Sequence, residues 1–199
     1  MALLRAPVPL GYGHASKEAH SIAAPLLTGA ALALAGVVAA ADKDKKIFYW
    51  PGVSLLMLVA TSMALLASIQ LHYYSRQFFY SRQDIHDWYD LDNSPEDEAQ
   101  LTRLYAWQGD DYKRWARNNN WAVRFFNAGT VLLGLGIVTV LLPPDGGQQA
   151  PCRWAAAGLV LLCTVAEAAW TLATFRKNTQ LRRRRGSTLS AIAKPRENA

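Results

Sequence analysis

Four long apolar segments constrain what this chain can fold into more than any other feature of its sequence. Two of them carry no charged residue, and the other two carry one each, Arg124 and Glu167. Each segment is about 20 residues long, which as a helix matches the roughly 30 Å hydrocarbon core of a bilayer. We therefore predict an all-α membrane protein with four transmembrane helices, at about 21–41, 51–72, 121–142 and 154–175.

The segments between these spans suggest one membrane domain, 21–175, with extensions. We expect residues 1–20 to be a flexible cytoplasmic leader and residues 176–199 to be a basic, largely disordered tail. Apolar and aromatic residues recur at helical spacing over 73–120, which predicts a cytoplasmic helical hairpin between the second and third spans. In this prediction the second helix continues to about Tyr89, and Ser94-Pro95 begins the returning helix.

The basic residues indicate the orientation, because Lys and Arg concentrate on the cytoplasmic side of membrane proteins. Seventeen of the 21 Lys and Arg residues lie in the leader, the hairpin with the start of the third span, and the tail. This places both termini in the cytoplasm. A high content of alanine and arginine suggests a bacterial inner membrane. A cleaved signal remains an alternative for residues 1–41, because Ala39, Ala40 and Ala41 fit a signal-peptidase site.

Polar residues inside the spans are the candidate functional residues. Glu167 lies well inside the fourth span, where a charge costs about 2.5–3.5 kcal/mol on insertion scales. It either binds a cation or proton, or is a protonated side chain that forms a hydrogen bond within the bundle. Arg124 and Asn127 lie near the cytoplasmic end of the third span, where Arg124 is expected to extend toward the lipid headgroups.

Opposite charges face the same compartment in this prediction. The hairpin carries a net charge of −3 and the tail +7. The tail is predicted to bind anionic headgroups, although the acidic hairpin is a competing partner. The lipid-binding candidates are its first basic residues: Arg176, Lys177, Arg182, Arg183, Arg184 and Arg185.

Several function classes lack their sequence signals. The four histidines and two cysteines have no metal-ligand spacing, and the acidic segment 90–98 has Pro95 where a calcium loop needs glycine, so we predict no metal and no cofactor. No nucleotide-binding, hydrolase or metalloprotease motif occurs, and we predict that the protein is not an enzyme. Nucleic acid is not an expected partner, because many of the basic residues border apolar runs.

Two functions remain open. The first is an oligomeric pore or channel-like protein, suggested by Glu167 and by small residues that allow close helix contact, at Gly29, Gly36, Gly129, Gly134, Gly136 and Gly158. This function implies a homo-oligomer. The alternative is a non-transporting membrane scaffold or partner subunit, whose hairpin at residues 73–120 recruits a cytoplasmic protein.

Overall fold

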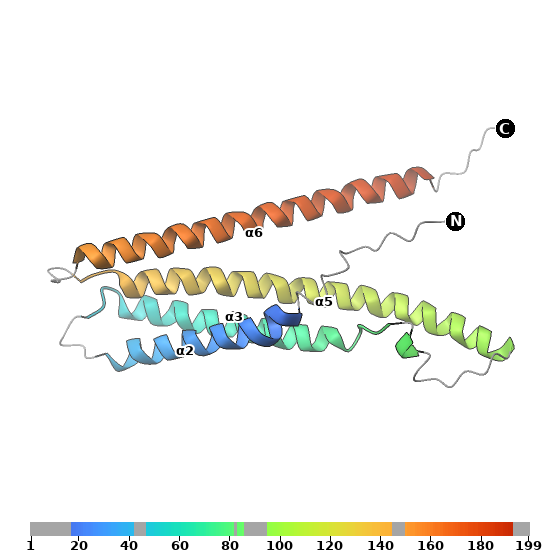
Figure 1. The fold of residues 1–199 in the computed structure, drawn as a ribbon, viewed down its shortest axis with the longest axis horizontal. Helices are drawn as coiled ribbons and strands as arrows, with labels where there is room; N and C mark the ends of the chain where they lie inside the picture. Colours follow the sequence, from blue (N-terminus) through green and yellow to red (C-terminus); the bar gives the residue numbers. More distant parts are fainter. Residues whose placement is uncertain (1–16, 42–46, 82, 86–94, 145–149, 193–199) are drawn as a thin grey trace.

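The computed structural model of this chain describes residues 17–41, 47–81, 83–85, 95–144 and 150–192, with the side chains of 95–97 and 177–192 left out. Its elements are η1 (Ala19–Ala23), α2 (Ala24–Ala40), α3 (Pro51–Arg76), α5 (Pro95–Leu141) and α6 (Ala150–Ile192). The described part is helical and contains no strand, which confirms the predicted all-α class. The helices lie along one long axis, with α6 against α5 and farthest from α2 and α3 (Figure 1).

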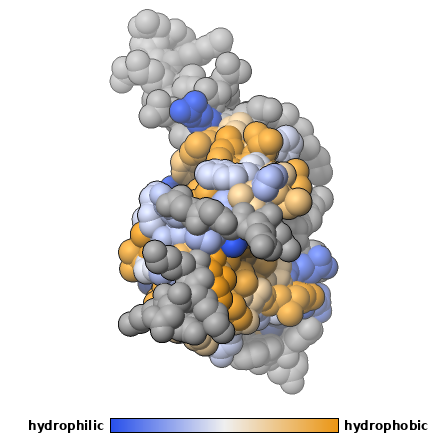
Figure 2. Space-filling view, turned by 90° about the vertical axis from the view of Figure 1, so that its left-hand side faces the viewer, coloured by the Kyte–Doolittle hydropathy of each residue, from blue (hydrophilic) through white to orange (hydrophobic). Residues whose placement is uncertain are grey.

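Four described helices are long and apolar enough to cross a membrane, as expected for a multi-pass membrane protein. They cover Ala19–Ala40, Pro51–Arg76, Glu98–Leu141 and Ala150–Arg176. Many large apolar side chains on them face outward, among them Leu26, Leu56, Leu162 and Trp170. Apolar side chains reach the surface in the end-on view of Figure 2. A lipid surround accounts for this exposure, because lipid is as apolar as these side chains.

The packing of α3 against α5 follows a seven-residue repeat on both helices. On α3 most of the buried positions follow this repeat and alternate between hydroxyl residues and larger ones, in the order Ser54, Leu58, Thr61, Leu65, Ser68, His72 and Ser75, and the buried Ser62 lies beside the repeat. Large side chains of α3 face glycines of α5. A Cβ atom at Gly129 would lie 2.8 Å from Leu65, and one at Gly136 would lie 3.1 Å from Leu58. Spacings of three and four residues that repeat every seven are typical of helices that cross at a shallow angle.

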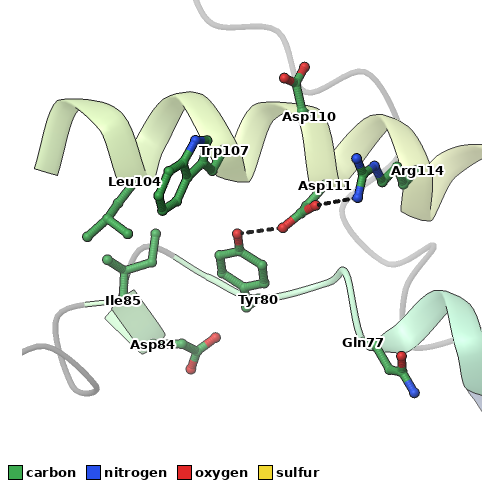
Figure 3. A pocket seen from close by; sticks show the side chains of 9 residues that line it. All are labelled: Gln77, Tyr80, Asp84, Ile85, Leu104, Trp107, Asp110, Asp111 and Arg114. Carbon is green, nitrogen blue, oxygen red and sulfur yellow. Dashed lines mark hydrogen bonds and ion pairs between the residues drawn. The ribbon is translucent and has the colours of Figure 1, made fainter. Parts of the chain in front are cut away.

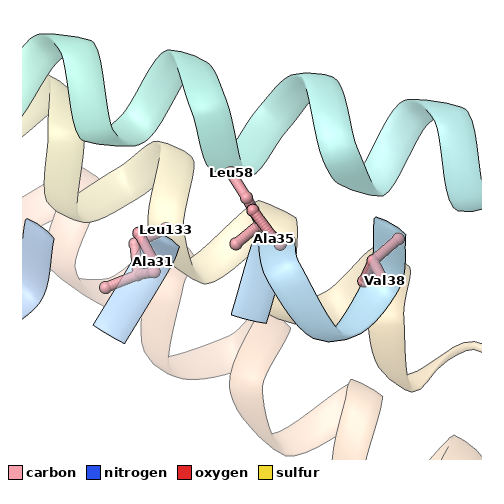
Figure 4. Close-up of a cluster of buried hydrophobic side chains, with 5 residues drawn as sticks. All are labelled: Ala31, Ala35, Val38, Leu58 and Leu133. Atoms are coloured by element: carbon pink, nitrogen blue, oxygen red, sulfur yellow. The ribbon is translucent and has the colours of Figure 1, made fainter. Parts of the chain in front are cut away.

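The first helix packs against this pair through small residues. Ala31, Ala35 and Val38 of α2 form a buried cluster with Leu58 and Leu133 (Figure 4). Small side chains let the helix backbones approach closely, so dispersion contacts stabilise the pair where lipid provides no hydrophobic driving force. The residues preceding α2 form the π-helical turn η1, in which His20 is buried.

Arg153 holds the opposite end of the bundle together. Its guanidinium donates hydrogen bonds to the carbonyl oxygens of Val140, Leu141 and Leu142 at 3.1–3.3 Å, and to that of Ile47 at 3.2 Å. The last carbonyl groups of a helix have no partner within the helix. Arg153 therefore caps α5 from the first turns of α6.

One predicted boundary was wrong. Helix α3 ends at Arg76 rather than near Tyr89, because Phe79 and Tyr80 leave the helical path and contact α5. Helix α5 begins at Pro95, as predicted, and is one helix of 47 residues, so its first half continues directly into the third span. Helix α6 runs to Ile192, where we expected a disordered tail. Arginine, leucine and glutamine are strong helix formers, which favours this continuation.

Candidate functional site

A cavity lies beside the point where α3 ends. Its volume is about 770 Å³, and it is lined by Gln77, Tyr80, Asp84, Ile85, Leu104, Trp107, Asp110, Asp111 and Arg114 (Figure 3). One wall is the segment after α3, and the other is a face of α5 from Leu104 to Arg114. The 47 residues of α5 would span about 70 Å. This length exceeds the bilayer core, so we place the cavity on the part of α5 outside the membrane.

Tyr80 connects the two walls of this cavity. Its hydroxyl donates a hydrogen bond of 2.9 Å to Asp111 Oδ2, and its carbonyl oxygen accepts one of 3.0 Å from Gln108 Nε2. Phe79 packs on Trp115, with ring centroids 4.8 Å apart. These contacts hold residues 79–80 against α5 without regular secondary structure.

The turn that follows Tyr80 has its own reciprocal cap. The Ser81 backbone N–H donates to Asp84 Oδ2 at 2.5 Å, and the Asp84 backbone N–H donates to Ser81 Oγ at 3.1 Å. Hydrogen bonds from the Ser81 backbone N–H and from the Ser81 side chain lower the pKa of the Asp84 carboxyl below its usual value, because both stabilise the charged form. Asp84 is therefore a carboxylate at neutral pH.

Negative charge predominates in the cavity lining. Among the described lining residues, Asp84, Asp110 and Asp111 contribute three carboxylates against one cation, Arg114, whose Nη1 lies 3.9 Å from Asp111 Oδ1. Asp110 points away from Tyr80 in Figure 3 and pairs with Lys113 at 2.7 Å. The indole of Trp107 is 63% exposed. An exposed indole among carboxylates suits a cationic group, which gains both ion pairing and a cation–π contact.

A second polar cluster lies where η1, α3 and α5 meet. The His20 and His72 rings stack with centroids 4.4 Å apart and an interplanar angle of 12°. His72 Nδ1 lies 3.2 Å from Asn119 Oδ1, and all three side chains are at least 90% buried. Ser68 Oγ donates to the carbonyl oxygen of Ala122 at 2.9 Å, one turn away. We infer that these contacts fix the positions of the three helices relative to one another.

The structure does not bring the intramembrane candidates together. Glu167 lies exposed on α6. The Arg124 guanidinium instead lies 4.9 Å from the ring centroids of both Trp121 and Phe175. Asn127 is half-buried, and its carbonyl oxygen accepts a hydrogen bond from Thr130.

The basic candidates are only partly described. Arg176 is exposed on α6. The helix continues through the other five, but their side chains lie outside the described part: Lys177, Arg182, Arg183, Arg184 and Arg185. Among the described residues, no three His, Cys, Asp or Glu side chains gather closely enough to hold a metal ion.

Most of the cavity and the histidine cluster were not predicted from sequence. Gln108 and Trp115 lie in the range 73–120 that was predicted to form a hairpin, and both contact the segment after α3. His72 carried a signal that could have been recognised: it lies seven residues beyond Leu65 and fourteen beyond Leu58 on the buried side of α3. Tyr80 and Asp111 are 31 residues apart, and no local pattern relates them.

Comparison of the chain with protein-family models, with curated proteins and with solved structures finds no match. The function must therefore be inferred from the geometry alone.

Proposed function

We propose that this protein is a non-enzymatic membrane-anchored binding protein, which uses the cavity between residues 77–85 and α5 to bind a basic segment of a cytoplasmic protein. The observation that carries this proposal is the cavity of about 770 Å³, with three carboxylates and an exposed indole. A lysine or arginine side chain can form an ion pair with the carboxylates and a cation–π contact with the indole. The charge distribution of the sequence supports a cytoplasmic location for this cavity.

Binding of a labelled peptide tests this proposal directly. The full chain in lipid nanodiscs is titrated against a fluorescein-labelled lysine-rich peptide, with a glutamate-rich peptide as reference, and binding is followed by fluorescence anisotropy. Removal of an aromatic side chain that becomes buried on binding costs about 2 kcal/mol or more. We therefore expect Trp107→Ala to weaken binding of the lysine-rich peptide by roughly thirtyfold.

A matched pair of charge variants distinguishes a site from general attraction. Asp111→Asn removes a carboxylate in the cavity, whereas Glu98→Gln removes an exposed one on the same helix outside the lining. The proposal requires Asp111→Asn to weaken binding and Glu98→Gln to leave it unchanged. Equal effects of the two variants, or full binding by Trp107→Ala, would contradict it.

The orientation can be tested with the exposed thiol of Cys152, which lies at the opposite end of the bundle from the cavity. A membrane-impermeant maleimide added to intact cells should label Cys152 in a Cys163→Ser background. Labelling only after the cells are broken would place the cavity on the outer side, where it could not meet a cytoplasmic partner.

An oligomeric pore is the second candidate function, and the exposure of Glu167 on α6 favours it. A charge facing lipid near mid-span costs about 2.5–3.5 kcal/mol, so a neighbouring subunit that covers Glu167 would stabilise an assembly. Ion flux through liposomes that is lost in Glu167→Gln but kept in Cys163→Ser supports the pore. Absence of flux, with a monomer or dimer in native membrane, eliminates it.

A further inference from the structure

A separate group of residues lies where α5 and α6 emerge toward the headgroups. The two helices are antiparallel, and their register is set where Gly134 meets Thr164. Arg124 and Phe175 lie ten and eleven residues from this contact, or about 15 Å along the helices. Half the hydrocarbon thickness is also about 15 Å. The group therefore lies close to the depth of the lipid phosphates when the Gly134 contact is near mid-membrane.

The Arg124 guanidinium is held by two aromatic rings. It lies 4.9 Å from the centroid of Trp121 on α5 and 4.9 Å from that of Phe175 on α6, within the range of a cation–π contact. Trp121 is 49% exposed and Phe175 is 45% exposed, so the rings lie on the outer surface of the helix pair. An arginine held in this way has its N–H donors available to a planar or tetrahedral anion.

The positive charge at this position has no acidic partner within the chain as described. The ion pairs found in the described ranges join Lys113 to Asp110 and Arg114 to Asp111. Neither Arg124 nor Arg176 pairs with a carboxylate among these residues. Arg176 follows Phe175 directly and is exposed. Arg124, which contacts Phe175, and Arg176, the next residue on α6, thus both lack an acidic partner among the described residues.

We propose that Arg124 and Arg176 form a binding site for the phosphate of an anionic phospholipid, with Trp121 and Phe175 against the upper part of its acyl chains. Arginine forms charge-assisted, often bidentate hydrogen bonds to phosphate. Indole rings favour the depth at which lipid headgroups meet the acyl chains. The helices separate on the far side of this group, since α6 diverges from α5 toward its C-terminal end (Figure 1). The site is independent of the cavity beside Tyr80.

Native mass spectrometry of the full chain tests this site. The protein is released from nanodiscs of equal parts phosphatidylglycerol and phosphatidylcholine, and the phosphatidylglycerol retained per chain is counted. A basic residue near an anionic surface contributes about 1 kcal/mol, which is a factor of roughly five in retention. We expect Arg124→Gln and Arg176→Gln each to lower retention by this factor. The retention by Arg124→Lys should lie between that of the parent protein and that of Arg124→Gln, because lysine keeps the charge and loses the planar donors.

Controls separate the site from its alternatives. Arg103→Gln removes an exposed charge from the same helix about 32 Å away and should leave retention unchanged. Loss of Arg124 would disturb the contact between α5 and α6, so Arg176→Gln is the decisive variant, because the structure shows no side-chain hydrogen bond, ion pair or ring contact between Arg176 and another described residue. Unchanged retention in Arg176→Gln, or an equal loss in Arg103→Gln, overturns the proposal. Displacement of the lipid by millimolar inorganic phosphate would show a free-anion site and also overturn it.

Discussion

Substitution of Gly129 by alanine tests whether the α3–α5 contact controls stability. The new Cβ atom would lie 2.8 Å from the Cγ and Cδ2 atoms of Leu65, against an optimum of about 3.5–4.0 Å. Leu65 would have to move by roughly 1 Å, and it is fully buried. Adding a methyl group to a well-packed core costs about 1–3 kcal/mol.

Gly109→Ala on the same helix provides the reference. Nothing lies within 4 Å of a Cβ atom at Gly109, so this change gains only the helix propensity of alanine, about 1 kcal/mol. Because Gly129→Ala receives at most a similar gain, the difference between the two variants estimates the packing cost. We expect Gly129→Ala to be less stable than Gly109→Ala by roughly 1–3 kcal/mol.

The measurement is the midpoint of unfolding by SDS in mixed micelles, followed by circular dichroism and tryptophan fluorescence. Leu65→Ala removes the atoms that the new methyl group would meet, so its combination with Gly129→Ala should be less destabilising than the sum of the single changes. Equal stability of Gly129→Ala and Gly109→Ala, or full additivity with Leu65→Ala, would refute the proposed packing of the two helices.

Three further predictions follow from hydrogen bonds of single side chains. Asn119→Ala leaves the buried Nδ1 of His72 without its partner and should lower the free energy of unfolding by about 1–3 kcal/mol, measured by the same SDS titration; an unchanged midpoint would contradict this. The Asp84 carboxyl, whose pKa is lowered, should titrate below 3.8 in a carbon NMR titration. Its contribution to the stability of the turn is present above 3.8 and is lost as the pH falls through the folded-state pKa, and Ser81→Ala should raise that pKa. Arg153→Gln removes donors to four carbonyl oxygens and should cost at least about 1.5–3 kcal/mol in thermal unfolding, whereas an unchanged melting temperature would argue against the cap.

The glycines show how far sequence could predict the packing. Six glycines were predicted to allow close helix contact. Only Gly129, Gly134 and Gly136 lie close to another described helix, and the other three have open space where a Cβ atom would be. The sequence provides the same small side chain at every position. Which face is covered depends on the rotation of each helix about its axis, and that is decided by all its neighbours together.

The aromatic segment after α3 is the corresponding case for the candidate site. Helical spacing predicted a continuous helix to about Tyr89, and α3 ends at Arg76. Phe79 packs on Trp115, and Tyr80 forms hydrogen bonds with Gln108 and Asp111, all on α5. We infer that these contacts stabilise the segment more than another helical turn would. Contacts across about 30 residues override the local preference, and the cavity exists because they do.

The sequence alone determined that four helices of this chain are suited to a membrane, because hydrophobic length is a local property that each segment carries by itself. Only the tertiary structure decided where charged and polar groups meet. It separated Arg124 from Glu167, placed Arg124 between two aromatic rings, and stacked His20 on His72. The Arg124–Phe175 and His20–His72 pairs join residues far apart in the chain, and their geometry arises only when the helices pack in one register.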